Sequence, residues 1–223
     1  MKGEAHPAAT IGLNVQDPII RFVESLDRGQ RIEAIAHELT HFILLYQFGL
    51  RLITRRRPSP GNREEVYKYF LDMNKDWFYL LGQIGNTTHH LLLIDYLKEK
   101  YGIPSDLHLR LLHHNFHIVA NEWCKDQESL YAKGIIAFEY ERLIGHVDRV
   151  IDPFGQGEPF WKAYQSAQKH FGGYGFGSIP TPSAHDESVL SFLEDLGYAK
   201  EDFVFFPPHL SKSDRDERIP VNQ

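Results

Sequence analysis

The sequence predicts an α+β protein in which helices predominate and a small sheet lies near the N-terminus. Two observations indicate helices: long stretches lack Gly and Pro, and they carry apolar residues at helical spacing. A third observation is that strand-like segments are few and short. Hydrophobic residues form 42% of the 223-residue chain, so a sizeable core is expected.

Each element follows from this pattern in chain order. The first 49 residues are predicted to form a short strand at 8–15, a helix or strand at 19–26 and a helix at 31–48. Gly49 is expected to end this helix in the left-handed backbone conformation. A brief strand is expected at 50–54. The remaining predicted helices span residues 64–84, 89–100, 107–120, 128–150, 159–171 and 187–196. Gly85-Asn86 is expected to separate the first two of these, and 128–150 is expected to be a long amphipathic helix.

The domain organisation expected from length and composition is simple. Residues 1–178 are predicted to form the main domain, and residues 179–223 a C-terminal extension with one helix and a polar tail. We expect the tail from Ser211 to be disordered because it is polar and charged.

Charge and cysteine content limit the function classes. The formal net charge is −6, which favours neither nucleic acid nor an anionic membrane as a partner. The single cysteine, Cys124, cannot form an internal disulfide, and the N-terminal residues lack the apolar run of a signal peptide. We therefore expect a cytoplasmic protein.

The most specific motif is His37-Glu38-Leu39-Thr40-His41, which has the form His-Glu-x-x-His. Residues four apart lie on the same face of a helix, so the two imidazoles can bind one Zn²⁺. The intervening Glu38 can then act as a general base toward a water at the metal. The motif predicts a zinc hydrolase.

The helix that carries the motif is predicted to be buried on both sides. One stripe is wholly apolar and comprises Ile32, Ile35, Leu39, Phe42, Ile43 and Tyr46. His37 and His41 lie nearly opposite this stripe, flanked by Leu44 and Leu45. Since buried polar groups need partners, a metal ion is a good explanation for two histidines on that side.

A catalytic zinc usually has three protein ligands, so a third is expected. We favour His90, which follows Asn86 near the start of a leucine-rich helix. Three alternatives remain open: His89, Glu65 and Glu122.

Four further histidines, His108, His113, His114 and His117, are expected mainly on a solvent-exposed helix face. The candidate oxyanion donors are Tyr67, His114, Tyr164, His170 and Tyr174.

The motif resembles that of the zincin superfamily of metallopeptidases. The pairing of residues 37–41 with Asn86-x-x-x-His90 is similar to a group of little-characterised bacterial zincin-like proteins. This resemblance implies a zincin-like core, with His37, His41 and His90 as zinc ligands and Glu38 as general base. Residues 36–45 are also similar to the ImmA/IrrE family, whose third ligand is a glutamate; Glu65 would be its counterpart.

We therefore predict a zinc-dependent metallopeptidase that acts on a peptide or protein substrate. The first alternative is a zinc-binding regulatory or interaction protein without turnover. The second is a nucleic-acid-associated protein, suggested by Arg51, Arg55, Arg56 and Arg57. Neither the cleavage specificity nor the oligomeric state follows from the sequence.

Overall fold

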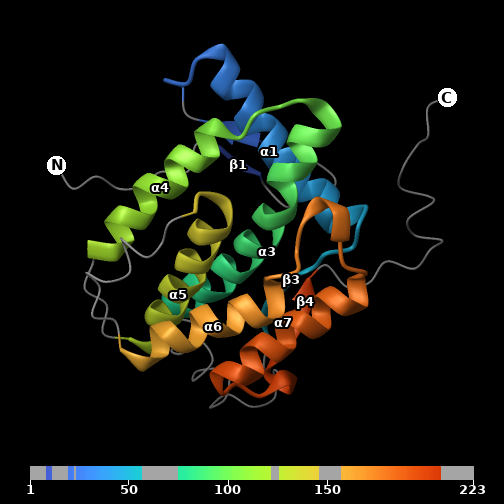
Figure 1. Cartoon of the computed structure of the whole chain (residues 1–223). Helices are drawn as coiled ribbons and strands as arrows, with labels where there is room; N and C mark the ends of the chain where they lie inside the picture. Colours follow the sequence, from blue (N-terminus) through green and yellow to red (C-terminus); the bar gives the residue numbers. More distant parts are fainter. Residues whose placement is uncertain are drawn as a thin grey trace, which may run out of the picture.

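The computed structural model describes residues 9–11, 20–22, 24–56, 75–121, 126–145 and 157–206. The fold is predominantly helical, as Figure 1 shows. The helices are α1 (Arg28–Tyr46), α3 (Lys75–Tyr101), α4 (Asp106–Asn121), α5 (Gln127–Leu143), α6 (Glu158–Phe171) and α7 (Pro182–Leu196). The strands are β1 (Ala9–Ile11), β2 (Ile20–Phe22), β3 (Leu52–Arg55) and β4 (Phe203–Phe206). This confirms the predicted helical predominance.

The strands form two separate antiparallel pairs. β1 pairs with β2 near the N-terminus, with Ala9 opposite Phe22. β3 pairs with β4, with Leu52 opposite Phe206. Strand β4 was not predicted from the sequence, and it joins β3 from the far end of the chain.

The predicted helix break at Gly85-Asn86 is wrong, because α3 continues from Lys75 to Tyr101. A Cβ atom at Gly85 would lie 2.8 Å from Cδ2 of Leu52. This glycine therefore lets β3 approach the helix closely. The part of the predicted 64–84 helix before residue 75 lies outside the described residues.

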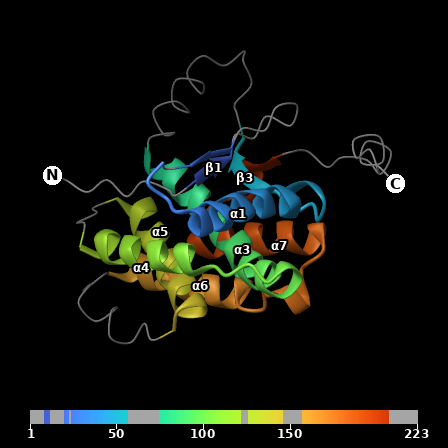
Figure 2. The same ribbon diagram turned by 90° about the horizontal axis from the view of Figure 1, so that it is seen from above.

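The predicted amphipathic helix at 128–150 is instead a central, buried helix. Every residue of α5 from Tyr131 to Tyr140 is buried. The helix packs against α3, α4 and α6, and Figure 2 shows these helices gathered around it. It ends at Leu143, before Gly145, whose φ is +81°. Enclosure by helices on several sides explains why no polar stripe is present on this helix.

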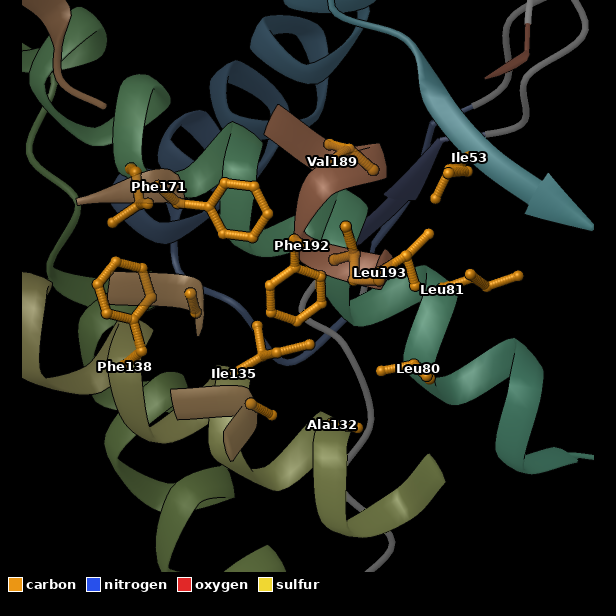
Figure 3. Packing of buried hydrophobic residues seen from close by; sticks show 14 of the residues in the cluster. Ile53, Leu80, Leu81, Ala132, Ile135, Phe138, Phe171, Val189, Phe192 and Leu193 are labelled. Carbon is orange, nitrogen blue, oxygen red and sulfur yellow. The ribbon is translucent and has the colours of Figure 1, made fainter. Parts of the chain in front are cut away.

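The core joins residues that are far apart in the chain. Figure 3 shows Leu80 and Leu81 of α3 near Ile135 of α5 and Phe192 and Leu193 of α7. Residues after 178 thus contribute α7 and β4 to the common core. The division at residue 178 stays a prediction, and the tail from residue 211 lies outside the described residues.

Helix α1 begins with a capping box, and one of the two sides that the sequence predicts to be buried is partly exposed. The Asp27 side chain accepts a hydrogen bond from the Gln30 backbone N–H, and the Gln30 side chain accepts one from the Asp27 backbone N–H. Ile32 and Leu39 of the apolar stripe are about half exposed, at 51% and 47%. The histidine-bearing side faces inward as predicted, and Leu44 and Leu45 beside it are buried.

Among the helices that the structure describes, none is both long and apolar enough to cross a membrane.

Gly134 of α5 provides a test of the central packing. A Cβ atom there would lie 2.4 Å from the Phe160 carbonyl oxygen of α6. We expect Gly134→Ala to destabilise the fold by about 1–3 kcal/mol, as overpacking does. Denaturant unfolding measures this change.

Gly82→Ala is the matched control, because Gly82 lies in α3 and a Cβ atom there would have nothing within 4 Å of it. Alanine should stabilise that helix by roughly 0.5–1 kcal/mol. Equal effects of the two substitutions would contradict the close contact between α5 and α6.

Candidate metal centre

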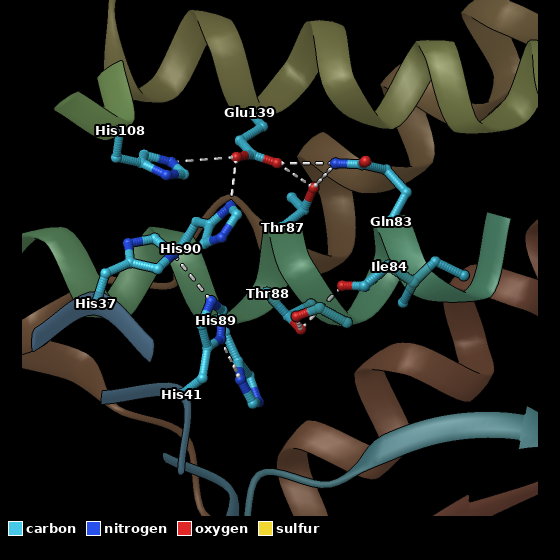
Figure 4. A network of polar contacts seen from close by, with 11 residues as sticks. His37, His41, Gln83, Ile84, Thr87, Thr88, His89, His90, His108 and Glu139 are labelled. Carbon is cyan, nitrogen blue, oxygen red and sulfur yellow. Dashed lines mark hydrogen bonds and ion pairs between the residues drawn. The ribbon is translucent and has the colours of Figure 1, made fainter. Parts of the chain in front are cut away.

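Four helices bring a cluster of histidines and one glutamate together in the interior (Figure 4). α1 contributes His37 and His41, α3 His90, α4 His108 and α5 Glu139. His37 and His41 lie one turn apart, and their Nε2 atoms are 3.1 Å from each other. The helix predicted to carry the motif therefore presents both imidazoles to the same interior space.

Two overlapping groups in this cluster have donor atoms close enough to hold a metal ion. The first consists of His37, His41 and His90, and the second of His90, His108 and Glu139. In each group the donor atoms lie within 4.8 Å of one another. Imidazole nitrogens and a carboxylate are ordinary ligands of divalent transition metals, so the donor set suits such an ion.

Glu139 orients His90. Its Oε1 lies 2.7 Å from His90 Nδ1, while Thr87 and Gln83 donate hydrogen bonds to its Oε2. These three residues of α3 occupy one face of that helix, at positions 83, 87 and 90. With Nδ1–H donated to the carboxylate, Nε2 is the nitrogen that His90 has left for a metal ion.

His89 orients His41 in a similar way. Its Nε2 lies 2.9 Å from the carbonyl oxygen of Leu50, and a carbonyl can only accept, so Nε2 carries the proton. Nδ1 of a neutral His89 must then accept, and it lies 3.1 Å from His41 Nδ1. His41 therefore donates through Nδ1–H and keeps its Nε2 lone pair for a ligand. This tautomer assignment follows from the hydrogen-bond partners.

Burial favours the neutral form of four histidines in or beside the cluster, His37, His41, His89 and His108. It lowers the pKa of His37 and His41 well below the usual value, and the neighbouring histidines lower it further. Burial also lowers the pKa of His89 and His108 to about 3. Neutral imidazole is the form that binds a metal ion, so these histidines need no deprotonation at neutral pH.

The Glu139 carboxylate is held in its charged form. Burial by itself raises the pKa of this side chain. The electrostatic attraction and hydrogen bond of the His90 N–H, with smaller effects of His108 and Thr87, outweigh burial and lower the pKa below its usual value.

His108 was expected on an exposed helix face, and this prediction is wrong. Its ring stacks on His37 at 4.6 Å between centroids and meets His90 at 4.2 Å. The buried Glu33 of α1 accepts a hydrogen bond from the His108 backbone N–H at 3.0 Å, which joins the start of α4 to α1. The sequence held a signal: His108 precedes the buried Leu112 by one helical turn.

The other histidines of α4 lie away from the cluster or cannot be placed. His113 pairs with the Tyr140 hydroxyl at 2.7 Å, and His114 is exposed. The side chain of His117 lies outside the described residues.

Glu139 was not identified from the sequence at all. It stands within Gly134–Tyr140, where all other members are small, apolar or aromatic. An ionisable residue inside such a run is a signal for a buried polar site.

The structure brings His37, His41 and His90 together. His89 lies beside the cluster with both ring nitrogens engaged. Glu65 and Glu122 lie outside the described residues. Glu38 is half-buried on α1, and in the described part of the chain its carboxylate belongs to neither ligand group. The roles of these residues as ligands and base stay predictions.

Three of the candidate oxyanion donors have partners elsewhere. Tyr164 donates to Glu141, His170 pairs with Asp195, and Tyr174 pairs with His185. Tyr67 lies outside the described residues.

The arginines that suggested nucleic-acid binding take part in internal contacts. Arg51 forms an ion pair with the largely buried side chain of Asp186. Arg55 packs over Trp77 with 4.8 Å to the ring centroid, and Arg56 donates to the Glu201 carbonyl. These contacts give the arginines a structural role around β3. Arg57 lies outside the described residues.

In comparisons with known proteins, no family model matches this chain, and no curated protein or solved structure matches it. The resemblance to zincins stays a prediction from the motif.

The contacts of His89 predict a difference between two substitutions. The amide of His89→Gln can accept from His41 and donate to the Leu50 carbonyl, whereas His89→Leu can do neither. We expect His89→Leu to weaken metal binding about 10–100-fold, as loss of such an orienting partner does, and His89→Gln to weaken it much less. Competition with a chromophoric chelator measures the affinities. Equal losses in both variants would contradict the orienting role of His89.

The low pKa of buried histidines predicts acid sensitivity of the metal-free protein. The folded-state pKa of His89 is about 3, below the unfolded value near 6.5. The stability that neutral His89 contributes is therefore complete above about pH 6.5 and is lost as pH falls toward 3. At pH 5 the expected loss from this residue is on the order of 2 kcal/mol.

Chemical unfolding with a chelator present, at pH 7.5 and pH 5, checks this expectation. Comparison with His89→Gln isolates the contribution of one histidine, because glutamine does not titrate. An identical pH dependence of stability in the two proteins would show that His89 is not the source of the acid sensitivity.

Proposed function

We propose that this protein is a zinc-dependent metallopeptidase in which His37, His41 and His90 hold Zn²⁺ and Glu38 is the general base. The observation that carries this proposal is the convergence of three imidazoles from α1 and α3 on one interior space. Two of them lie in a His-Glu-x-x-His motif on a helix. A zincin-like active-site core is part of the same proposal.

The donor set favours zinc. Three imidazole nitrogens with a fourth position left for water are typical of catalytic zinc sites. Hydrogen bonds already fix the tautomers of His41 and His90 so that Nε2 is available. Orienting partners of this kind accompany ligand histidines in zinc enzymes.

The chemistry follows from the residues around the ion. Bound zinc supplies Lewis acidity, which lowers the pKa of water and polarises a carbonyl. Glu38 follows His37 directly on the ligand helix, so its carboxylate can accept the proton of the attacking water and return it to the leaving amine. Glu139 keeps His90 oriented during these steps.

A regulatory zinc-binding protein without turnover is the competing proposal, and Glu38 separates the two. We expect Glu38→Gln to keep one zinc ion at the first ligand group and to reduce peptide cleavage by about 10²–10⁴-fold, the usual contribution of a general base. Mass spectrometry of a peptide library incubated with each protein measures cleavage, and elemental analysis measures zinc.

Glu99→Gln is the matched control, because Glu99 is exposed on α3 and should be dispensable. His90→Gln should lose the zinc as well as the activity. Wild-type protein that binds zinc but cleaves no peptide would favour the regulatory role. Full zinc content in the His90 variant would overturn the choice of ligands.

A further inference from the structure

His108 carries a ring nitrogen that the proposed zinc site does not use. Its Nε2 is buried and has no hydrogen-bond partner in the described structure. Leaving such a nitrogen unsatisfied costs about 1–3 kcal/mol. The ring is held in place by stacking on His37 and by the hydrogen bond between Glu33 and the backbone of α4. A bound ligand at His108 Nε2 would offset this cost.

Glu139 presents the complementary problem of charge. Its side chain is 1% exposed, and among the described residues its partners are His90, His108, Thr87 and Gln83. None of these is a lysine or an arginine. A buried carboxylate needs a nearby positive charge. An ion at the first group is separated from this carboxylate by the ring of His90.

The distances around Oε1 of Glu139 fit a cation. His108 Nε2 lies 3.8 Å from this oxygen, which is too far for a hydrogen bond. Two ligands that each lie about 2.0–2.2 Å from one ion can be separated by such a distance. His90 Nδ1 also lies close to the same oxygen, at 2.7 Å.

We propose that a second divalent metal ion binds at His108 Nε2, Glu139 Oε1 and His90 Nδ1, beside the ion of the proposed function. This inference rests on the proposed function in one respect, which is that both ions use His90. The donor set of two nitrogens and one carboxylate suits first-row transition metals, with Zn²⁺ as a member of the class.

Sharing His90 has a chemical consequence. The Nδ1 proton that His90 now donates to Glu139 leaves to solvent when the second ion takes its place, so the ring bridges two ions as an imidazolate. Binding of the second ion therefore releases this proton. Because the ions share a ligand, occupancy of either site changes the affinity of the other reciprocally.

The number of ions bound per chain tests the proposal. Metal-stripped full-length protein is dialysed against graded Zn²⁺ at pH 7.5, and bound zinc is counted by elemental analysis. We expect two ions for the wild type and one for His108→Phe, which keeps an aromatic ring against His37 but removes the nitrogen. His114→Phe makes the same change at an exposed position of α4 and should keep two ions.

Each outcome decides the question. One ion in the wild type, lost in His37→Gln and kept in His108→Phe, would overturn the second site and leave the proposed zinc site standing. Two ions in His108→Phe would show that His108 is not a ligand. Loss of both ions in that variant, with an unchanged circular dichroism spectrum, would mean one joint site and would also overturn the proposal. Absence of bound zinc in the wild type would overturn both proposals.

Discussion

The hydrogen bond between Glu139 of α5 and His90 of α3 is the interaction on which the interior depends. It places an ionised carboxylate at the centre of the fold, where it needs several donors to be stable. Thr87 and Gln83 supply these donors only because α3 is one continuous helix that presents them on the same face as His90. Gly85 lies within this helix, and its missing side chain admits Leu52 of β3.

The same interior favours the neutral form of His37, His41, His89 and His108. Burial disfavours imidazolium, and a neutral ring has one nitrogen as donor and the other as acceptor or ligand. The Leu50 carbonyl fixes the protonation of His89, and His89 fixes that of His41. A backbone carbonyl beside β3 thus determines which nitrogen of the motif histidine is available for a metal ion. A metal ion bound at His41 would therefore be coupled to folding through ordinary hydrogen bonds.

Much of the secondary structure could be predicted from local sequence. Periodicity and capping residues predict the motif helix and the helices near 107–120 and 159–171. They also predict the left-handed backbone conformation of Gly49 after the motif helix. The errors occurred where long-range packing decides. Gly85 was interpreted as a break although it serves a close contact, and α5 was expected to have a polar face although neighbouring helices enclose it.

The sequence by itself determined that two histidines and a glutamate would share one helix, because a four-residue spacing is a local property of helical geometry. It also pointed to His90 through composition and context. Only the tertiary structure decided that His108 and Glu139 join the cluster and that His89 stands behind His41. These residues come from helices far apart in the chain, and their meeting depends on how α1, α3, α4 and α5 pack. No local pattern specifies that packing, because it depends on side-chain shape across the whole core.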